Sequence, residues 1–95
     1  PYAGIFVQDS TYITISGSVG GEIHMSVSQC STPGVLINYG NSHHIIVEYL
    51  DIDRNGDERN EDGFVVKYNG DIYPYVELRY STIHENWQDQ CVRFV

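Results

Sequence analysis

Residues 51–63, with the sequence DIDRNGDERNEDG, concentrate side chains whose oxygen atoms could bind a metal ion. Calcium takes about six to eight hard oxygen ligands, which carboxylates, amides and backbone carbonyls supply. The spacing predicts a calcium site formed by five residues of this segment, namely Asp51, Asp53, Asn55, Asp57 and Asp62. The alternative is a solvated turn between two strands, because Asp, Asn and Gly are common turn residues and charges there oppose aggregation.

The first half of this segment, DIDRNG, resembles the start of the calcium-binding loop of EF-hand proteins. The resemblance implies that the first two aspartates and Asn55 bind through side chains, that Asp57 binds through its carbonyl, and that Asp62 closes the site. Two residues depart from the EF-hand pattern. Glu58 stands where an aliphatic residue is usual, and Arg59 places a cation where an oxygen ligand is expected. The flanking segments have the character of strands, so the resemblance is confined to the loop.

No other segment has the spacing of a catalytic or metal site. The chain has no G-x-S-x-G elbow, no H-E-x-x-H motif and no glycine-rich phosphate loop, so enzyme activity is not expected. Four histidines are present, at positions 24, 43, 44 and 84. Adjacent His43 and His44 on one strand would point to opposite faces, which disfavours a shared metal and predicts surface histidines.

The two cysteines, Cys30 and Cys91, do not form a C-x-x-C pair and therefore do not suggest zinc. Their positions predict one disulfide, with two free core thiols as the alternative. Closing a loop of about 60 residues contributes roughly 4 kcal/mol in the chain-entropy model. Disulfides persist outside the cytosol, so the same reasoning predicts a secreted protein.

Tyrosine is unusually frequent, with eight residues in 95, and one tryptophan is present. Tyr and Trp are favoured at recognition surfaces because each combines a large rigid face with a polar tip. We expect Tyr73, Tyr75, Tyr80 and Trp87 to contact a protein partner, with an exposed strand edge in residues 71–80 adding a partner strand. The alternative is ordinary packing, because tyrosine is a good β-sheet residue.

The elements that must carry these residues are short β-strands. Apolar and polar residues alternate with period two in segments 11–16, 22–28, 76–80 and 91–95. Three further segments are apolar throughout and predict central strands, namely 4–7, 35–37 and 44–50.

Turn residues separate these strands. Residues 16–21, SGSVGG, predict a hairpin loop, and Asn69-Gly70 predicts a tight hairpin joining 64–68 to 71–75. Pro74 places the second of those strands at a sheet edge. No internal repeat is apparent. The sequence therefore predicts one domain over residues 1–95, an antiparallel β-sandwich, Ig-like or a similar small sandwich or barrel, of about six to nine strands.

Composition excludes several classes of function. Thirteen acidic residues against five basic ones give a net charge of −8, which argues against binding to nucleic acid or to an anionic membrane. Hydrophobic residues make up 41% of the chain, enough for a packed core. No apolar run approaches the roughly 18 residues of a membrane span.

In its size, its pair Cys30 and Cys91 and its short alternating strands, the chain resembles the small secreted effectors of fungi of the MAX type. That resemblance implies a six-stranded β-sandwich with one disulfide and a host-protein target in virulence, and it carries over no functional residues. The leading expectation is a secreted, non-catalytic module that binds a protein through a sheet edge and tyrosine-rich loops. The alternatives are a calcium-stabilised carbohydrate-binding module and an Ig-like structural segment of a larger surface protein.

Overall fold

A computed structural model describes most of the chain, over residues 3–30, 33–38, 42–55, 63–67, 75–86 and 92–94. This part of the chain is all-β and contains no helix, and so none that could cross a membrane. The all-β class expected from the alternating pattern is therefore confirmed. Its strands are β1 (Ile5–Val7), β2 (Thr11–Ser16), β3 (Ser18–Val19), β4 (Glu22–Ile23), β5 (Met25–Ser28), β6 (Val35–Ile37), β7 (His43–Glu48), β8 (Leu50–Asp53), β9 (Phe64–Val66), β10 (Val76–Arg79), β11 (Thr82–His84) and β12 (Val92–Phe94).

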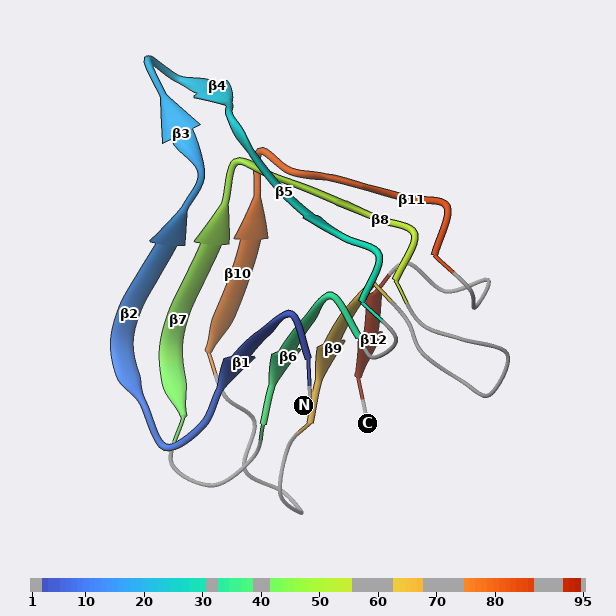
Figure 1. Ribbon diagram of the computed structural model, residues 1–95. Coiled ribbons are helices and arrows are strands. Elements are labelled where there is room, and N and C mark those ends of the chain that lie inside the picture. The colour runs from blue at the N-terminus through green and yellow to red at the C-terminus, as the bar shows by residue number, and fades with distance from the viewer. Residues whose placement is uncertain are drawn as a thin grey trace.

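The strands wind into successive coils that stack on one another, as in a parallel β-helix (Figure 1). We call β1, β2 and β5 coil 1, β6, β7 and β8 coil 2, and β9, β10 and β11 coil 3, with β12 beginning a fourth. Each strand pairs in parallel with its equivalent in the next coil, which gives the sheets β1-β6-β9-β12, β2-β7-β10 and β5-β8-β11. In the described residues, the only antiparallel pair is the β3-β4 hairpin, which interrupts coil 1. The predicted antiparallel sandwich is therefore wrong.

The error lies in the pairing of the strands and not in their positions. Alternation with period two shows which residues of a strand face the core. The alternation is the same whether the strand pairs with the next strand in the sequence or with a strand in the next coil. Segment 44–50, expected to be one strand, instead turns a corner between β7 and β8. Tyr49 makes this corner with a φ of 55°, and Tyr80 makes the corresponding corner of coil 3 with a φ of 51°.

A repeat is present after all, marked by a glycine before the first strand of each complete coil. Gly4, Gly34 and Gly63 precede β1, β6 and β9, and each is followed by three apolar residues. A Cβ atom on Gly34 would lie 2.7 Å from Asn55 Nδ2 and 2.9 Å from the Gly63 carbonyl oxygen. Glycine is therefore required at the point where the last residues of a coil come close to the first strand of the same coil.

The core is a column of aliphatic side chains that the three sheets enclose. Inward-facing residues alternate along each strand and stack on their equivalents in the next coil, as Val35 and Phe64 do in sheet β1-β6-β9-β12. The buried cluster comprises Val7, Val27, Val35, Ile37, Ile45, Val47, Leu50, Ile52, Phe64 and Val66.

A ladder of polar groups centred on the buried side chain of Asn55 stabilises the corner that follows β8 and β11. Asn55 is fully buried, and its Nδ2 donates to Val27 O (3.0 Å) and to Asn86 Oδ1 (3.1 Å). Its Oδ1 accepts a hydrogen bond from the Cys30 backbone N–H at 3.1 Å. Cys30 occupies the same place in coil 1 as the two asparagines do in coils 2 and 3. Every hydrogen-bonding group of the Asn55 amide is thus used inside the fold.

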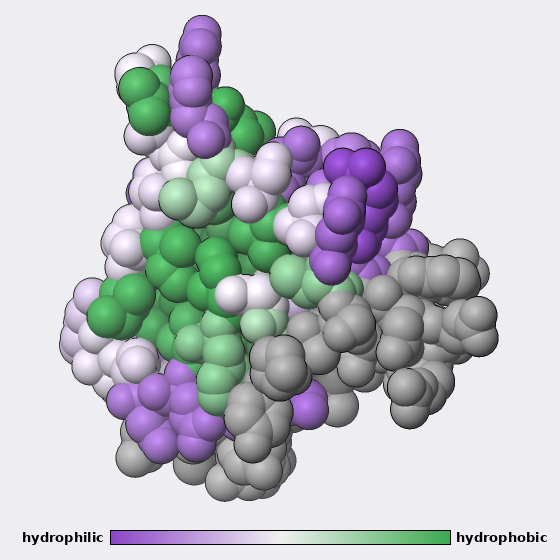
Figure 2. Space-filling view, viewed as in Figure 1, coloured by the Kyte–Doolittle hydropathy of each residue, from purple (hydrophilic) through white to green (hydrophobic). Residues whose placement is uncertain are grey.

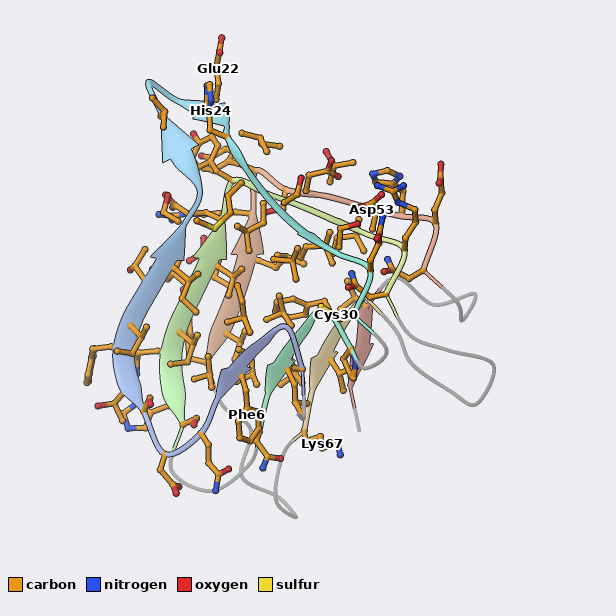
Figure 3. All side chains as sticks on the ribbon, in the orientation of Figure 1. Phe6, Glu22, His24, Cys30, Asp53 and Lys67 are labelled. Carbon is orange, nitrogen blue, oxygen red and sulfur yellow. The ribbon has the colours of Figure 1, made fainter. Side chains whose placement is uncertain are left out.

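The predicted disulfide is also wrong, because the thiol of Cys30, a residue that Figure 3 labels, is free. Cys30 lies against Gly4, beside the start of β1. Cys91, the predicted partner, lies outside the described residues. The expectation of secretion rested on this disulfide and remains a prediction without it.

Candidate functional site

The aspartates of the predicted calcium loop lie on a strand. Asp51 and Asp53 are on β8, two residues apart, so both project from the outer face, while Ile52 between them is fully buried in the core. Asn55 points inward, and its amide oxygen already accepts the Cys30 N–H. The structure therefore brings the two aspartates to one face and separates Asn55 from them. Asp57 and Asp62 lie outside the described residues, and calcium binding remains a prediction.

A charged cluster forms on the outer face of β8 and β11, where Asp53 is a register neighbour of His84. His84 Nε2 lies 2.7 Å from Asp51 Oδ1, and His84 Nδ1 lies 3.7 Å from Glu85 Oε1. The hydrogen bond to Asp51 raises the pKa of His84 above its usual value, so the imidazolium form is favoured. Potential ligand atoms of Asp53, His84 and Glu85 lie within 4.8 Å of one another, which is close enough to share a cation.

Arg54 completes this cluster from the corner after β8. Its Nε lies 2.7 Å from Asp53 Oδ2, and its backbone φ of 51° allows the chain to turn between outward Asp53 and inward Asn55. Burial alone would raise the pKa of Asp53, yet hydrogen bonding from the side chains of Ser28 and Arg54, together with the charges of Arg54 and His84, outweighs burial and holds this pKa below its usual value. The carboxylate of Asp53 is therefore ionised and already neutralised by protein groups.

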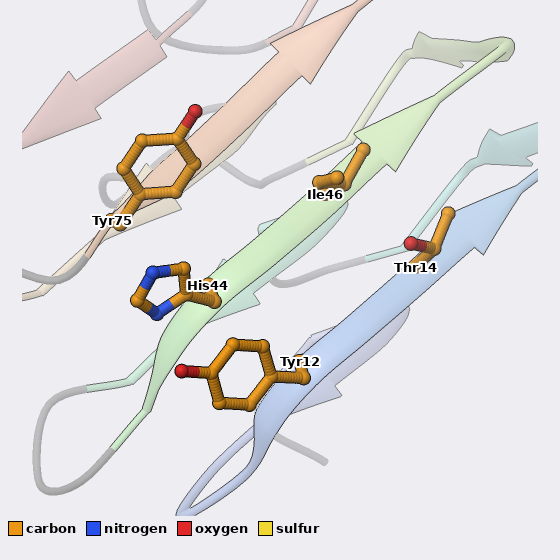
Figure 4. A pocket seen from close by; sticks show the side chains of 5 residues that line it. All are labelled: Tyr12, Thr14, His44, Ile46 and Tyr75. Carbon is orange, nitrogen blue, oxygen red and sulfur yellow. The ribbon is translucent and has the colours of Figure 1, made fainter.

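A row of aromatic rings crosses the outer face of sheet β2-β7-β10 (Figure 4). Tyr12, His44 and Tyr75 each belong to a different strand or its immediate start. The ring centroids of Tyr12 and His44 lie 4.6 Å apart with 16° between planes, and those of His44 and Tyr75 lie 5.2 Å apart with 20°. Tyr12 is 72% exposed and Tyr75 57% exposed. The three nearly parallel rings thus form a continuous aromatic surface open to solvent, which we call the aromatic row.

The aromatic row borders a shallow groove of about 200 Å³, lined by its three residues together with Thr14 and Ile46. Thr14 and Ile46 are register neighbours on β2 and β7, and each lies two residues along its strand from Tyr12 or His44. The groove therefore combines aromatic faces, one aliphatic side chain, a hydroxyl and the imidazole nitrogens. A few polar groups in a mainly apolar concave surface are typical of sites that bind small molecules or single chain segments.

The backbone is distorted at two members of the row, Tyr12 and His44. Both residues have positive φ angles, 57° and 56°, within otherwise regular strands. The distortion turns His44 toward His43, so that their Nδ1 atoms lie 2.8 Å apart, within hydrogen-bond distance. The expectation that these two histidines point to opposite faces is therefore wrong, because it assumed regular strand geometry.

A charged row crosses the same sheet further along the strands. Arg79 Nη2 lies 2.7 Å from Glu48 Oε1, and the Ser16 hydroxyl donates to Glu48 Oε2 at 2.9 Å. The hydrogen bond from Arg79, followed by that from Ser16, lowers the pKa of Glu48 below its usual value. Glu77 lies 3.4 Å from Arg79 on the groove side of this row. The face is thus apolar and aromatic at one end of its strands and polar at the other.

The tyrosines expected to bind a partner are distributed over two places. Tyr75 belongs to the aromatic row, whereas Tyr80 is 66% exposed at the corner after β10 and stacks on Tyr49 with ring centroids 5.0 Å apart. Tyr73 and Trp87 lie outside the described residues.

Sequence reasoning did not identify Tyr12 or His44 as site residues, although a signal existed. Segments 10–16 and 42–48 both begin with serine and have isoleucine at the fourth place. Aligning them superimposes Tyr12 on His44. The same comparison would have revealed the coils. No protein-family model, curated protein or solved structure matches the chain.

Proposed function

We propose that this protein is a non-catalytic binding module that holds a carbohydrate chain on the outer face of sheet β2-β7-β10. The observation that carries the proposal is the aromatic row, in which Tyr12, His44 and Tyr75 lie nearly parallel and exposed on three neighbouring strands. One face of a pyranose ring is lined by C–H groups, and such a face packs well against an exposed aromatic ring.

The surroundings of the row suit the remaining chemistry of a sugar. Thr14 and the imidazole of His44 offer hydrogen bonds at the groove, where sugar hydroxyls at the ring edge need partners. Further along the strands, Ser16, Glu48 and Arg79 present polar groups at the same surface. A net charge of −8 repels acidic polymers, so the proposed ligand is a neutral glycan and not a uronic-acid polymer or a nucleic acid.

Isothermal titration calorimetry against neutral oligosaccharides chosen from a glycan array tests the proposal. We expect Tyr12→Ala and Tyr75→Ala each to weaken binding by at least about tenfold, because each removes one stacking face. Tyr80→Ala is the matched control, since Tyr80 is comparably exposed but lies outside the groove. No saturable glycan binding, or equal losses in all three variants, would contradict the proposal. Binding to a protein that depends on Tyr80 alone would instead favour the protein-partner expectation.

A further inference from the structure

Three side chains of metal-binding types meet at the corner that follows β8 and β11. Potential ligand atoms of Asp53, His84 and Glu85 lie within 4.8 Å of one another. In the part of the chain that the structure describes, no other group of His, Cys, Asp and Glu side chains brings three such atoms this close. Figure 2 shows hydrophilic side chains gathered over this corner. The three residues come from two coils, because Asp53 ends β8 of coil 2 and His84 ends β11 of coil 3.

The backbone at Glu85 brings two consecutive side chains together. Neighbouring residues of a regular strand point to opposite faces, which would separate Glu85 from His84. Glu85 instead has a φ of 55°, and its Oε1 lies 3.7 Å from His84 Nδ1. Two ligand atoms of a tetrahedral zinc ion are about 3.4 Å apart, because each lies about 2.1 Å from the metal. A small movement of the side chains is therefore enough to fit such an ion.

Asp51 determines which nitrogen of His84 faces the other carboxylates. Its Oδ1 lies 2.7 Å from His84 Nε2. Because a carboxylate accepts hydrogen bonds, Nε2 carries a hydrogen atom, and Nδ1 is the nitrogen that can bind a metal. A carboxylate bonded to the second nitrogen of a ligating histidine is the usual arrangement at metal sites, where it fixes the orientation of the ring and increases its basicity.

The charges at this corner favour a divalent cation. The carboxylates of Asp51, Asp53 and Glu85 stand against the single guanidinium of Arg54, which leaves two negative charges when His84 is neutral. Arg54 contacts Asp53 through Oδ2. Since a carboxylate has two oxygen atoms and about four lone-pair sites, Asp53 can bind Arg54 and a metal ion together.

The ligand types indicate which metal fits. One imidazole nitrogen with two carboxylate oxygens is a set that zinc accepts, and three protein ligands leave a fourth position for water. Calcium and magnesium instead take oxygen ligands throughout.

We propose that Asp53, His84 and Glu85 bind a zinc ion that links coil 2 to coil 3, and that Asp51 positions the imidazole. The site shares Asp53 with the predicted calcium site, but its other ligands come from the corner after β11. It lies on sheet β5-β8-β11, whereas the aromatic row lies on sheet β2-β7-β10, so zinc binding is independent of the proposed glycan binding. An ion that joins two coils stabilises the folded state, because the unfolded chain does not hold its ligands together.

Isothermal titration calorimetry of the full chain with zinc chloride, after treatment with chelator and transfer to metal-free buffer, tests this proposal. We expect one zinc ion per chain with a Kd below about 100 μM. His84→Gln and Glu85→Gln should each weaken binding by at least about tenfold, because each removes one of three ligands. Glu22→Gln is the matched control, since Glu22 pairs with His24 at 3.8 Å on the hairpin and has no third ligand there. It should leave the Kd unchanged.

Two further variants separate a metal site from a structural defect. Asp51→Asn should weaken binding by about tenfold while the stoichiometry stays at one, because the imidazole keeps its place but loses the charge behind it. Arg54→Gln should strengthen binding by about two- to fivefold, because it removes a partly exposed cation beside Asp53. Damage to the fold would weaken binding in both variants. An affinity that does not rise in Arg54→Gln would exclude Asp53 as a ligand and overturn the site as described.

Hydrogen exchange gives a readout on the protein without substitutions. Zinc should increase the protection of amides in β8 and β11, while those of β2 and β3 should not change. No saturable zinc binding below about 1 mM would overturn the proposal. Zinc binding that is insensitive to both His84→Gln and Glu85→Gln would also overturn it, by placing the ion elsewhere. Calcium chloride is titrated in parallel, and calcium bound more tightly than zinc would overturn the proposal in favour of the calcium loop expected from residues 51–62.

Discussion

His84 and Asn86 lie two residues apart, yet one projects to the outside and the other to the inside of the same corner. Outside, the imidazole of His84 meets Asp51 from the preceding coil. Inside, the carboxamide of Asn86 accepts from the backbone and side chain of Asn55. Glu85 between them has a φ of 55°, which reverses the alternation of side chains. At the scale of single residues, one positive φ at this corner therefore separates a charged surface cluster from the polar ladder centred on Asn55.

The raised pKa of His84 predicts how stability depends on pH. A histidine whose pKa is higher in the folded state adds stability that is fully present below about pH 6.5 and is lost as the pH rises through the folded-state value. The thermal midpoint of the protein should therefore exceed that of His84→Gln most clearly near pH 6, and the difference should shrink toward pH 9. Differential scanning fluorimetry across this range measures it. His24→Gln, on the exposed hairpin, is the control, and a difference independent of pH would contradict the assignment.

Asn55 predicts a much larger effect, because its amide is buried and fully bonded. Asn55→Ala leaves the Cys30 N–H and the Val27 carbonyl without their partner and removes a donor to Asn86. We expect a loss of about 2–4 kcal/mol in the free energy of unfolding, measured by urea denaturation. The neighbouring variant Arg54→Ala removes a partly exposed ion pair and should cost less than about 1 kcal/mol. Similar costs for the two variants would show that the ladder does not stabilise the fold as described.

At the scale of elements, the coil closes where its last residue meets its first. A glycine lies at each of these closures, and its α-carbon meets the side chain at the end of the same coil. Gly4 meets Cys30, Gly34 meets Asn55, and Gly63 meets Asn86. The closure fixes where the first strand of each coil begins, and hence the register of sheet β1-β6-β9-β12. The strands of sheet β2-β7-β10 are stacked in the same coil order, which places Tyr12, His44 and Tyr75 side by side. The aromatic row is therefore a consequence of coil stacking.

Gly34→Ala tests the closure directly. The added methyl group would meet Ile52 Cγ2 at 2.7 Å and the Gly63 carbonyl oxygen at 2.9 Å, and the backbone carbonyl cannot move away without disturbing the next coil. We expect the free energy of unfolding to fall by about 1–3 kcal/mol in urea denaturation. Gly20→Asn is the control, because a Cβ at Gly20 meets nothing within 4 Å and Asn tolerates the positive φ of the hairpin turn. Unchanged stability in Gly34→Ala would refute the proposed steric role.

At the scale of the whole molecule, parallel coil stacking holds the fold together without a covalent link from Cys30. Each coil buries its aliphatic residues against the next, as neighbouring repeats of a solenoid do, so stability comes from contacts between adjacent coils.

The free thiol predicts that redox conditions do not change stability. Adding dithiothreitol should move the thermal midpoint by less than about 1 °C, whereas losing a disulfide that closes about 60 residues would cost roughly 4 kcal/mol. Alkylation of the unreduced, denatured protein followed by mass spectrometry should show Cys30 modified. A lower thermal midpoint in dithiothreitol, together with a Cys30 that alkylation leaves unmodified, would show that Cys30 does form a disulfide.

The amino-acid sequence by itself determined the all-β class, the position of segments such as 11–16, and which side chains of that segment face the core. These features are local, because alternation along one strand depends only on that strand. The partner of each strand was decided by tertiary structure, since β2 pairs with β7 about one coil away and alternation is identical for near and distant partners. The free thiol, the inward position of Asn55 and the meeting of Tyr12 with His44 all follow from that non-local pairing and from single positive φ angles at corners and bulges. Neither changes the alternation of apolar and polar residues within a single strand.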